Sequence, residues 1–152
     1  MLPAGLCALQ DLEELDLTAC GLTALPEGIG ALAGLRVLDL SNNYRLTALP
    51  EGLCLLTGLG ELNLSHCGLT ALPEGIAGLT GLKRLHLWDN EGLTALPAGL
   101  GWLCNLEKLN LEGLKVCPGL AALCELQRRE GLPALLAHLA AQGGEPAAGE
   151  AG

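Results

Sequence analysis

Leucine recurs along this chain in a pattern that repeats every 23 or 24 residues. Five units open with the sequence LxxLxL, in which the residues between the leucines are mostly polar. The last three positions alternate apolar, polar and apolar, which is the pattern of a β-strand with one buried face. The pattern therefore predicts five strands, near residues 15–17, 38–40, 62–64, 85–87 and 109–111.

Four of these strand motifs are followed by a turn, by LTALP, and by a stretch such as EGIGALAGL with apolar residues three apart. This spacing predicts a short helical or 3₁₀ segment, and the proline suits its first position because it donates no N–H. Successive strands then stack in parallel. Strands pack more closely than the arcs opposite, so the stack curves with its strands inside. The sequence predicts an α/β solenoid with parallel strands on the concave face and short helical or 3₁₀ arcs on the convex face.

The consensus LxxLxLxx(N/C)xLTxLPxxIxxLxxL, found from residue 2 to about 117, resembles the 23-residue class of leucine-rich repeats. That class occurs in Ras-suppressor-like, Roco-type and plant intracellular Ras-group proteins. The resemblance implies a right-handed solenoid that binds proteins through its concave face, often in signalling scaffolds. In such repeats the Asn or Cys after the strand points inward and bonds backbone groups of adjacent turns, which would otherwise stay unpaired. By position, this structural ladder consists of Cys20, Asn43, Cys67 and Asn90.

The domain organisation follows from where the repeat pattern starts and decays. Residues 1–142 are predicted to form one leucine-rich-repeat domain, with a half repeat at 2–11, repeats at 12–117 and a helical cap at 118–142. The cap is predicted as two helices separated at Gly131. Residues 143–152 contain no aliphatic anchor and are predicted to be disordered. The half repeat leaves three alternatives: a makeshift cap, missing upstream sequence, which we favour, or another molecule that covers this end.

The net charge and the cysteines indicate which kind of partner and which cellular compartment to expect. The net charge of −9 argues against nucleic acid, which requires a basic footprint. The chain shows no run of about 18 apolar residues and no signal-peptide pattern, so we expect no membrane span and a cytoplasmic protein. Of seven cysteines, Cys7 and Cys54, and likewise Cys20 and Cys67, stand 47 residues apart and so follow the repeat. We expect reduced, mostly buried thiols, with a disulfide or redox role as the alternative.

One tryptophan stands out on the predicted concave face, where the side chains between the strand leucines project. Trp88 occupies a position that holds Thr, Ser, Ser or Glu in the other coils. An exposed indole among basic residues is typical of a protein-binding hot spot; the alternative is an indole that only shields its neighbours, stacked on Arg84. Trp102 is expected to be partly buried on the convex arc. The predicted binding residues are His66, Arg84, His86, Trp88, Asp89 and Lys108, on a face that is acidic toward the N-terminal coils and basic toward the C-terminal ones.

Catalytic and metal-binding patterns are missing from the sequence, which has no G-x-S-x-G, no P-loop and no paired Cys/His signature. His66, His86 and Asp89 lack zinc-like spacing, so we expect no catalytic residue, no metal and no cofactor. The sequence predicts a non-enzymatic protein–protein interaction module, in an intracellular signalling or scaffold protein. Two alternatives remain: self-association as a homodimer through the uncapped N-terminal coil, and the recognition arm of a larger enzyme whose catalytic domain is absent.

Overall fold

The computed structural model describes residues 2–114 and 118–143. Short strands alternate with 3₁₀ segments, and two helices follow. The strands are β1 Glu14–Asp16, β2 Val37–Asp39, β3 Glu61–Asn63, β4 Arg84–His86 and β5 Lys108–Asn110. The 3₁₀ segments are η1 Ala4–Ala8, η2 Glu27–Ala31, η3 Glu51–Leu55, η4 Glu74–Gly78 and η5 Ala98–Trp102, and the helices are α1 Pro118–Glu130 and α2 Leu132–Gly143. Among the described residues, no helix is long and apolar enough to cross a lipid bilayer.

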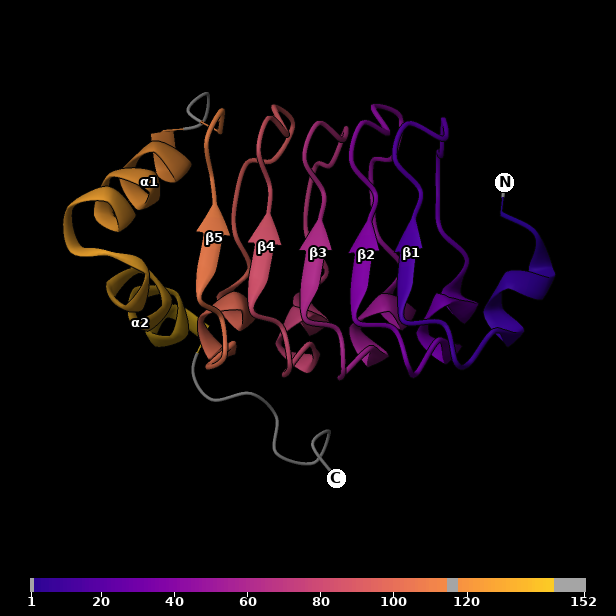
Figure 1. The fold of residues 1–152 in the computed structure, drawn as a ribbon. Helices are drawn as coiled ribbons and strands as arrows, with labels where there is room; N and C mark the ends of the chain where they lie inside the picture. The colour runs from indigo at the N-terminus through magenta and orange to yellow at the C-terminus, as the bar shows by residue number, and fades with distance from the viewer. Residues whose placement is uncertain (1, 115–117, 144–152) are drawn as a thin grey trace.

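The strands form one parallel sheet in the order β1-β2-β3-β4-β5, with the 3₁₀ segments on the other side of the coil (Figure 1). The middle leucines pair in register from coil to coil, as Leu38 does with Leu62. The predicted solenoid of parallel strands is therefore confirmed. We call the outward side of the sheet, which carries the residues that flank these leucines, the strand face.

Each strand lies one residue earlier than predicted. Pairing already begins before the middle leucine, because the Val37 N–H bonds the Glu13 carbonyl of the preceding coil at 3.0 Å. The leucine predicted to end each strand lies between the strand and the following turn, although Leu17 still donates its N–H to the Asp39 carbonyl at 2.8 Å. The leucine register was thus predicted correctly and the bounds were not.

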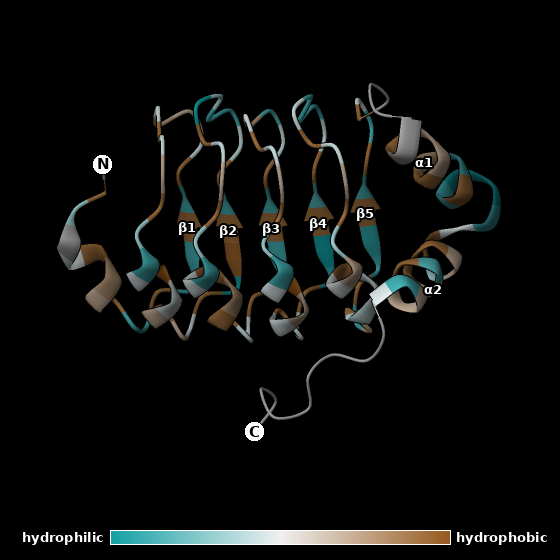
Figure 2. Ribbon diagram, turned by 180° about the vertical axis from the view of Figure 1, so that it is seen from behind, coloured by the Kyte–Doolittle hydropathy of each residue, from teal (hydrophilic) through white to brown (hydrophobic). Residues whose placement is uncertain are grey.

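Leucines from strands, turns and arcs fill one continuous core. Leu38, Leu62 and Leu85, the middle residues of β2 to β4, have no exposed surface. Leu15 on β1 is only partly buried, because no strand precedes it in the described chain. Figure 2 shows the same alternation, with a hydrophobic centre in each strand. Because each coil buries its leucines against the neighbouring coils, the stability of a coil depends on the whole stack.

A proline directly precedes each 3₁₀ segment instead of opening it as predicted. Pro26 is extended, with φ −71° and ψ 148°, and the first helical residue is the next one, Glu27. The Glu27 carboxylate accepts the Gly52 N–H at 2.7 Å and so fastens η2 to η3. Gly52 is required there, because a Cβ would overlap the Glu27 carbonyl oxygen.

The two C-terminal helices cover the last coil, at the end of the sheet opposite the N-terminus (Figure 1). Gly131, with φ +89°, separates them at the predicted residue. Leu135 and Leu139 of α2 are buried in the core, while α1 reaches the free edge of β5, where the Gln127 side-chain amide donates to the Leu109 carbonyl at 2.7 Å. α2 includes Gly143, the first residue of the predicted tail, and residues 144–152 lie outside the described part.

Candidate functional site

The turns after β2 and β4 are each held by a buried ladder asparagine. Asn43 is fully buried and its amide donates to the carbonyls of Leu17 at 3.0 Å and Leu40 at 2.8 Å. Its Oδ1 accepts the Leu22 N–H at 2.9 Å. Asn90 makes the equivalent bonds two coils later. Each asparagine thereby joins its own coil to the preceding one and fixes the turn from which the strand-face residues project.

The two cysteines of the ladder differ from each other. Cys67 is buried and its Sγ donates to the Leu40 carbonyl of the preceding coil at 3.2 Å, and burial raises the pKa of this thiol. Cys20 is exposed and reaches only the Thr18 carbonyl of its own turn, at 3.6 Å. The inward ladder role predicted for Cys20 is therefore wrong. That role requires the backbone of a preceding strand, and none precedes β1 in the described chain.

The prediction of mostly buried thiols is also wrong. Of the six described cysteines, only Cys54 and Cys67 are buried. Burial, with the nearby carboxylates, raises the pKa of Cys54 to about 11. Cys20, in the turn after β1, and Cys104, just after η5, are exposed. Cys117 lies outside the described residues.

A left-handed residue follows the strand in every coil, a feature that the sequence analysis missed. The backbone φ is positive at Asn42 (61°), His66 (53°) and Asp89 (57°). This conformation is unfavourable for most residues, and Asn, Asp and His tolerate it best. The column does carry that signal, since it holds Ala19, Asn42, His66, Asp89 and Gly113, of which Ala19 is the outlier.

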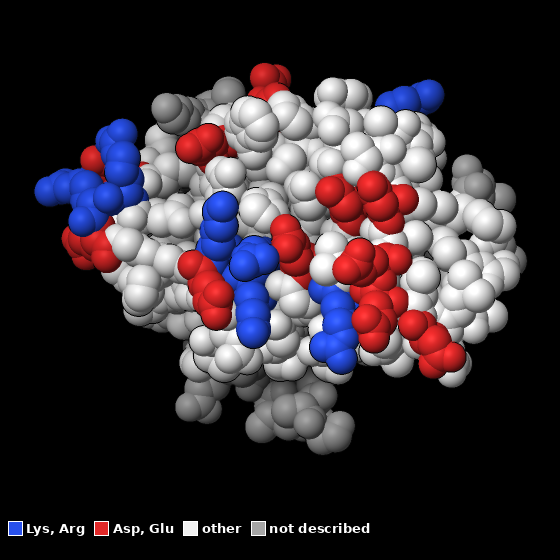
Figure 3. All heavy atoms as spheres, in the orientation of Figure 1, with Lys and Arg blue, Asp and Glu red and all other residues white. Residues whose placement is uncertain are grey.

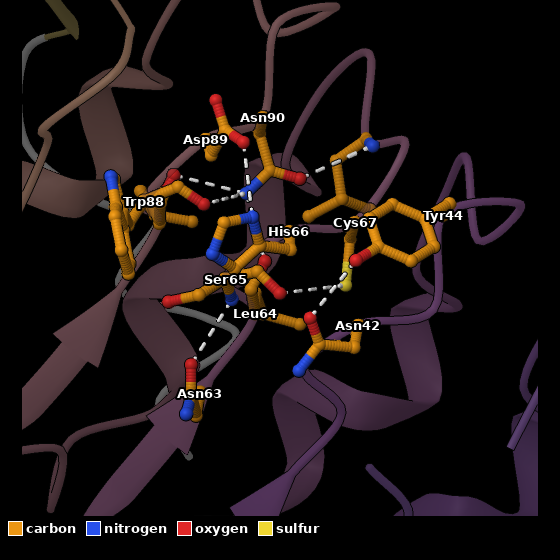
Figure 4. Close-up of polar contacts among 12 residues, drawn as sticks. Asn42, Tyr44, Asn63, Leu64, Ser65, His66, Cys67, Trp88, Asp89 and Asn90 are labelled. Atoms are coloured by element: carbon orange, nitrogen blue, oxygen red, sulfur yellow. Dashed lines mark hydrogen bonds and ion pairs between the residues drawn. The ribbon is translucent and has the colours of Figure 1, made fainter. Parts of the chain in front are cut away.

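Trp88 lies in the turn after β4, beside the strand face, where it is partly exposed and fixed from one side. Its side chain is 44% exposed. The centroids of the Trp88 and His66 rings lie 4.5 Å apart and the ring planes are tilted by 60° (Figure 4). The indole therefore packs on His66, and not on Arg84 as in the alternative of a merely shielding tryptophan. The His66 Nδ1 in turn bonds the Asp89 carboxylate at 3.0 Å. Asp89, His66 and Trp88 thus form a chain of contacts that orients the indole.

The serines expected to project beside Trp88 do not reach solvent. Ser41 and Ser65 are 7% and 8% exposed, so their predicted display on the open face is wrong. Both serines line a shallow hollow beside Trp88 and His86. This hollow has a volume of about 400 Å³. Trp88 therefore stands above a recessed polar floor.

The charges of the strand face are partly neutralised within the chain. Glu61 bonds both Arg84, at 3.4 Å, and His86, at 3.2 Å. Acidic side chains gather over β1 and β2, and lysine and arginine side chains over β4 and β5 (Figure 3). On β1, hydrogen bonds from Thr18 lower the pKa of Asp16. Across the described residues, no group of three or more His, Cys, Asp or Glu side chains could hold a metal ion.

A groove between β5 and the cap adds residues that sequence reasoning missed. Its volume is about 990 Å³. Side chains of β5 and the turn after it form the floor, Trp88 stands at one side, and α1 forms the other wall. The lining residues from these elements include Trp88, Lys108, Asn110, Glu112, Ala121, Cys124, Glu125, Gln127 and Arg128. The sequence predicted α1 as part of a cap without indicating which face of the last coil it would leave open.

Comparison with known proteins identifies the repeat. The family profile described as "Leucine-rich repeat region" matches residues 1–113. Receptor-like protein 1 of Arabidopsis thaliana is 56% identical over 39 residues, which are 26% of this chain and 4% of that protein.

Solved structures of leucine-rich-repeat proteins are also similar to this chain. LRR protein LIC12759 of Leptospira interrogans is 37% identical with a TM-score of 0.71, over 74% of this chain and 28% of that one. The leucine-rich repeat domain of the type III effector XCV3220 (XopL) is 28% identical with a TM-score of 0.55, over 76% and 49%. The chain thus spans less than half the length of each of these proteins.

Proposed function

The chain belongs to the leucine-rich repeat family, and we propose that it is a non-enzymatic module that binds a protein through the strand face around Trp88. The observation that carries this proposal is the exposed indole itself, 44% accessible beside a sheet whose outward residues are mostly polar or charged. Equivalent positions in the other coils are Thr18, Ser41, Ser65 and Glu112. The fold therefore does not require an aromatic residue at this position, whereas hot spots of protein interfaces are enriched in tryptophan.

The surroundings of Trp88 suit an anchor for binding. The contact with His66, which Asp89 holds at 3.0 Å, restricts the indole before any partner arrives. A side chain that is already ordered loses less conformational entropy on association. The recessed floor beside the indole also leaves part of the ring accessible to a partner's side chain.

The setting we propose is an intracellular signalling or scaffold protein in the cytoplasm. Free thiols at Cys7, Cys20, Cys54, Cys67 and Cys104, of which Cys20 and Cys104 are exposed, are consistent with a reducing compartment. The net charge of −9 favours a protein partner over nucleic acid. The second setting is the recognition arm of a longer protein with an activity of its own, which the coverage of 4% and 28% of the length of two relatives supports.

The test is a quantitative affinity capture with three versions of the immobilised protein: wild type, Trp88→Ala and Trp102→Ala. Trp102 is half-buried on the opposite side and provides the matched control. We expect Trp88→Ala to lose specifically retained proteins, with a binding cost of at least about 2 kcal/mol, and Trp102→Ala to keep them. Circular dichroism should show that both variants are folded. Loss with Trp102→Ala alone would place the binding surface elsewhere.

The second candidate function is self-association through the N-terminal edge. Leu9 is 51% exposed there, and Leu15 on the free edge of β1 is only partly buried. Against this candidate, a two-fold pairing of β1 would bring Glu14 and Asp16 close to the same acidic residues of the second copy, which is destabilising. Light scattering over a range of concentrations decides: a dimer that Leu9→Glu dissociates would support self-association.

A further inference from the structure

The groove between β5 and α1 has the form of a binding site with two ends of opposite charge. Lys108 lies at the start of β5 and Glu112 just beyond its end, and both side chains are exposed. Along the other wall, Arg128 and Glu125 pair with each other. Lys108 and Glu112 make no ion pair with any described residue. These two charges are therefore available to a ligand.

From this geometry we propose that the groove binds an extended peptide segment of the partner, with an acidic residue at Lys108 and a basic residue at Glu112. The inference rests on the proposed function and specifies its ligand. At about 3.3 Å per residue, the four steps from Lys108 to Glu112 span at most roughly 13 Å. An extended ligand peptide has the same rise, so its two charged residues stand four positions apart.

The middle of the groove suits the peptide between these charges. Trp88 on one side and Ala121 and Cys124 on the other leave room for a small apolar side chain. Asn110 lines the floor, and its Oδ1 accepts the Glu112 N–H at 3.0 Å, so the side-chain NH₂ group remains as a donor for a peptide carbonyl. The volume of about 990 Å³ is at the upper end for ligand sites, typically about 300–1,000 Å³.

Other ligand classes fit this groove less well. A simple anion would satisfy Lys108 and leave Glu112 unpaired, while a nucleic acid strand would be repelled by Glu112, Glu125 and the net charge of −9. A peptide with both charges matches both ends. Because exposed charges contribute more to orientation and specificity than to affinity, the order of charges along the peptide is the property that the groove should select.

The test is selection of peptides from a random heptapeptide phage library on the full chain. Wild-type protein should enrich sequences with an acidic and a basic residue four positions apart, in one order, around an apolar residue. The exchange Lys108→Glu with Glu112→Lys should enrich the opposite order. The matched control exchanges the charges of the exposed pair Arg36 and Glu13 outside the groove, and should select the wild-type order. Lys108→Ala alone should abolish only the preference for the acidic residue.

A labelled peptide from the wild-type selection then gives the affinities by fluorescence polarisation. We expect at least about tenfold weaker binding to the exchanged protein, and recovery when the charges of the peptide are also exchanged. Lack of enrichment, peptides without the charge pair, or an unchanged order on the exchanged protein would overturn the inference. Partner capture that Trp88→Ala abolishes but the Lys108 and Glu112 exchange preserves would refute the peptide groove while leaving the proposed function intact.

Discussion

Replacing the ladder residue by alanine in successive coils should give losses of stability that depend on its partners. Asn43→Ala removes the amide that serves the carbonyls of Leu17 and Leu40 and the oxygen that serves the Leu22 N–H, all at 2.8–3.0 Å. The Leu17 carbonyl and the Leu22 N–H then lose this partner, at about 1–3 kcal/mol each, and the Leu40 carbonyl keeps only the weak Cys67 thiol donor. The sum is reduced where the coil relaxes, so we expect about 3–5 kcal/mol.

The cysteines at the same position provide internal controls. Cys67 makes one bond of this kind, from a weak donor at 3.2 Å, so Cys67→Ala should cost about 1 kcal/mol. Cys20 is exposed, and Cys20→Ala should change the free energy of unfolding by less than about 0.5 kcal/mol.

Urea unfolding measures the free energy of unfolding of each variant, and the slopes with denaturant show whether the same surface is exposed. The expected order of loss is Asn43, then Cys67, then Cys20. Equal losses for Asn43→Ala and Cys67→Ala would refute the reasoning, because it ties the cost to the number of backbone groups left unpaired. The free energy of unfolding of Asn43→Cys should lie between those of the wild type and Asn43→Ala.

Three further outcomes follow from burial and backbone geometry. Leu62→Ala should cost about 2–5 kcal/mol in a denaturant titration, because it empties a fully buried core site, while Ser65→Ala, which removes only a small hydroxyl, should cost less than about 1 kcal/mol. A thiol reagent at neutral pH should label exposed Cys104 rapidly and Cys54 only after unfolding, since Cys54 is buried and its pKa is raised to about 11. Mass spectrometry of the labelled peptides gives the order of labelling, and rapid labelling of Cys54 in the folded protein would contradict its burial. Ala19→Gly should raise the midpoint of thermal unfolding and increase the free energy of unfolding by about 0.5–1 kcal/mol, because φ 55° at Ala19 is strained for any residue with a Cβ. A lower midpoint would show that Ala19 is not strained.

Features that repeat within one unit were predictable from the sequence. The alternation around leucines such as Leu38 specifies which side of each strand is buried, because the two faces of a strand alternate with every residue. The 23- or 24-residue period places equivalent positions in columns, which predicted the parallel order of strands and the inward asparagines. Trp88 was identified for the same reason, as the residue that departs from its column.

Features that depend on contact between coils were decided only by the tertiary structure. Cys20 and Cys67 share one repeat position, yet only Cys67 has a preceding strand to bond, so the repeat pattern alone predicted the same role for both. The contact of Trp88 with His66 depends on side-chain orientation across two strands, which periodicity does not specify. The groove exists because α1 packs against the free edge of β5 through Gln127, and the direction in which a helix docks is set by packing over the whole last coil. Leucine spacing thus determined the scaffold, while the shape of the binding surface was determined by how neighbouring coils and the cap meet.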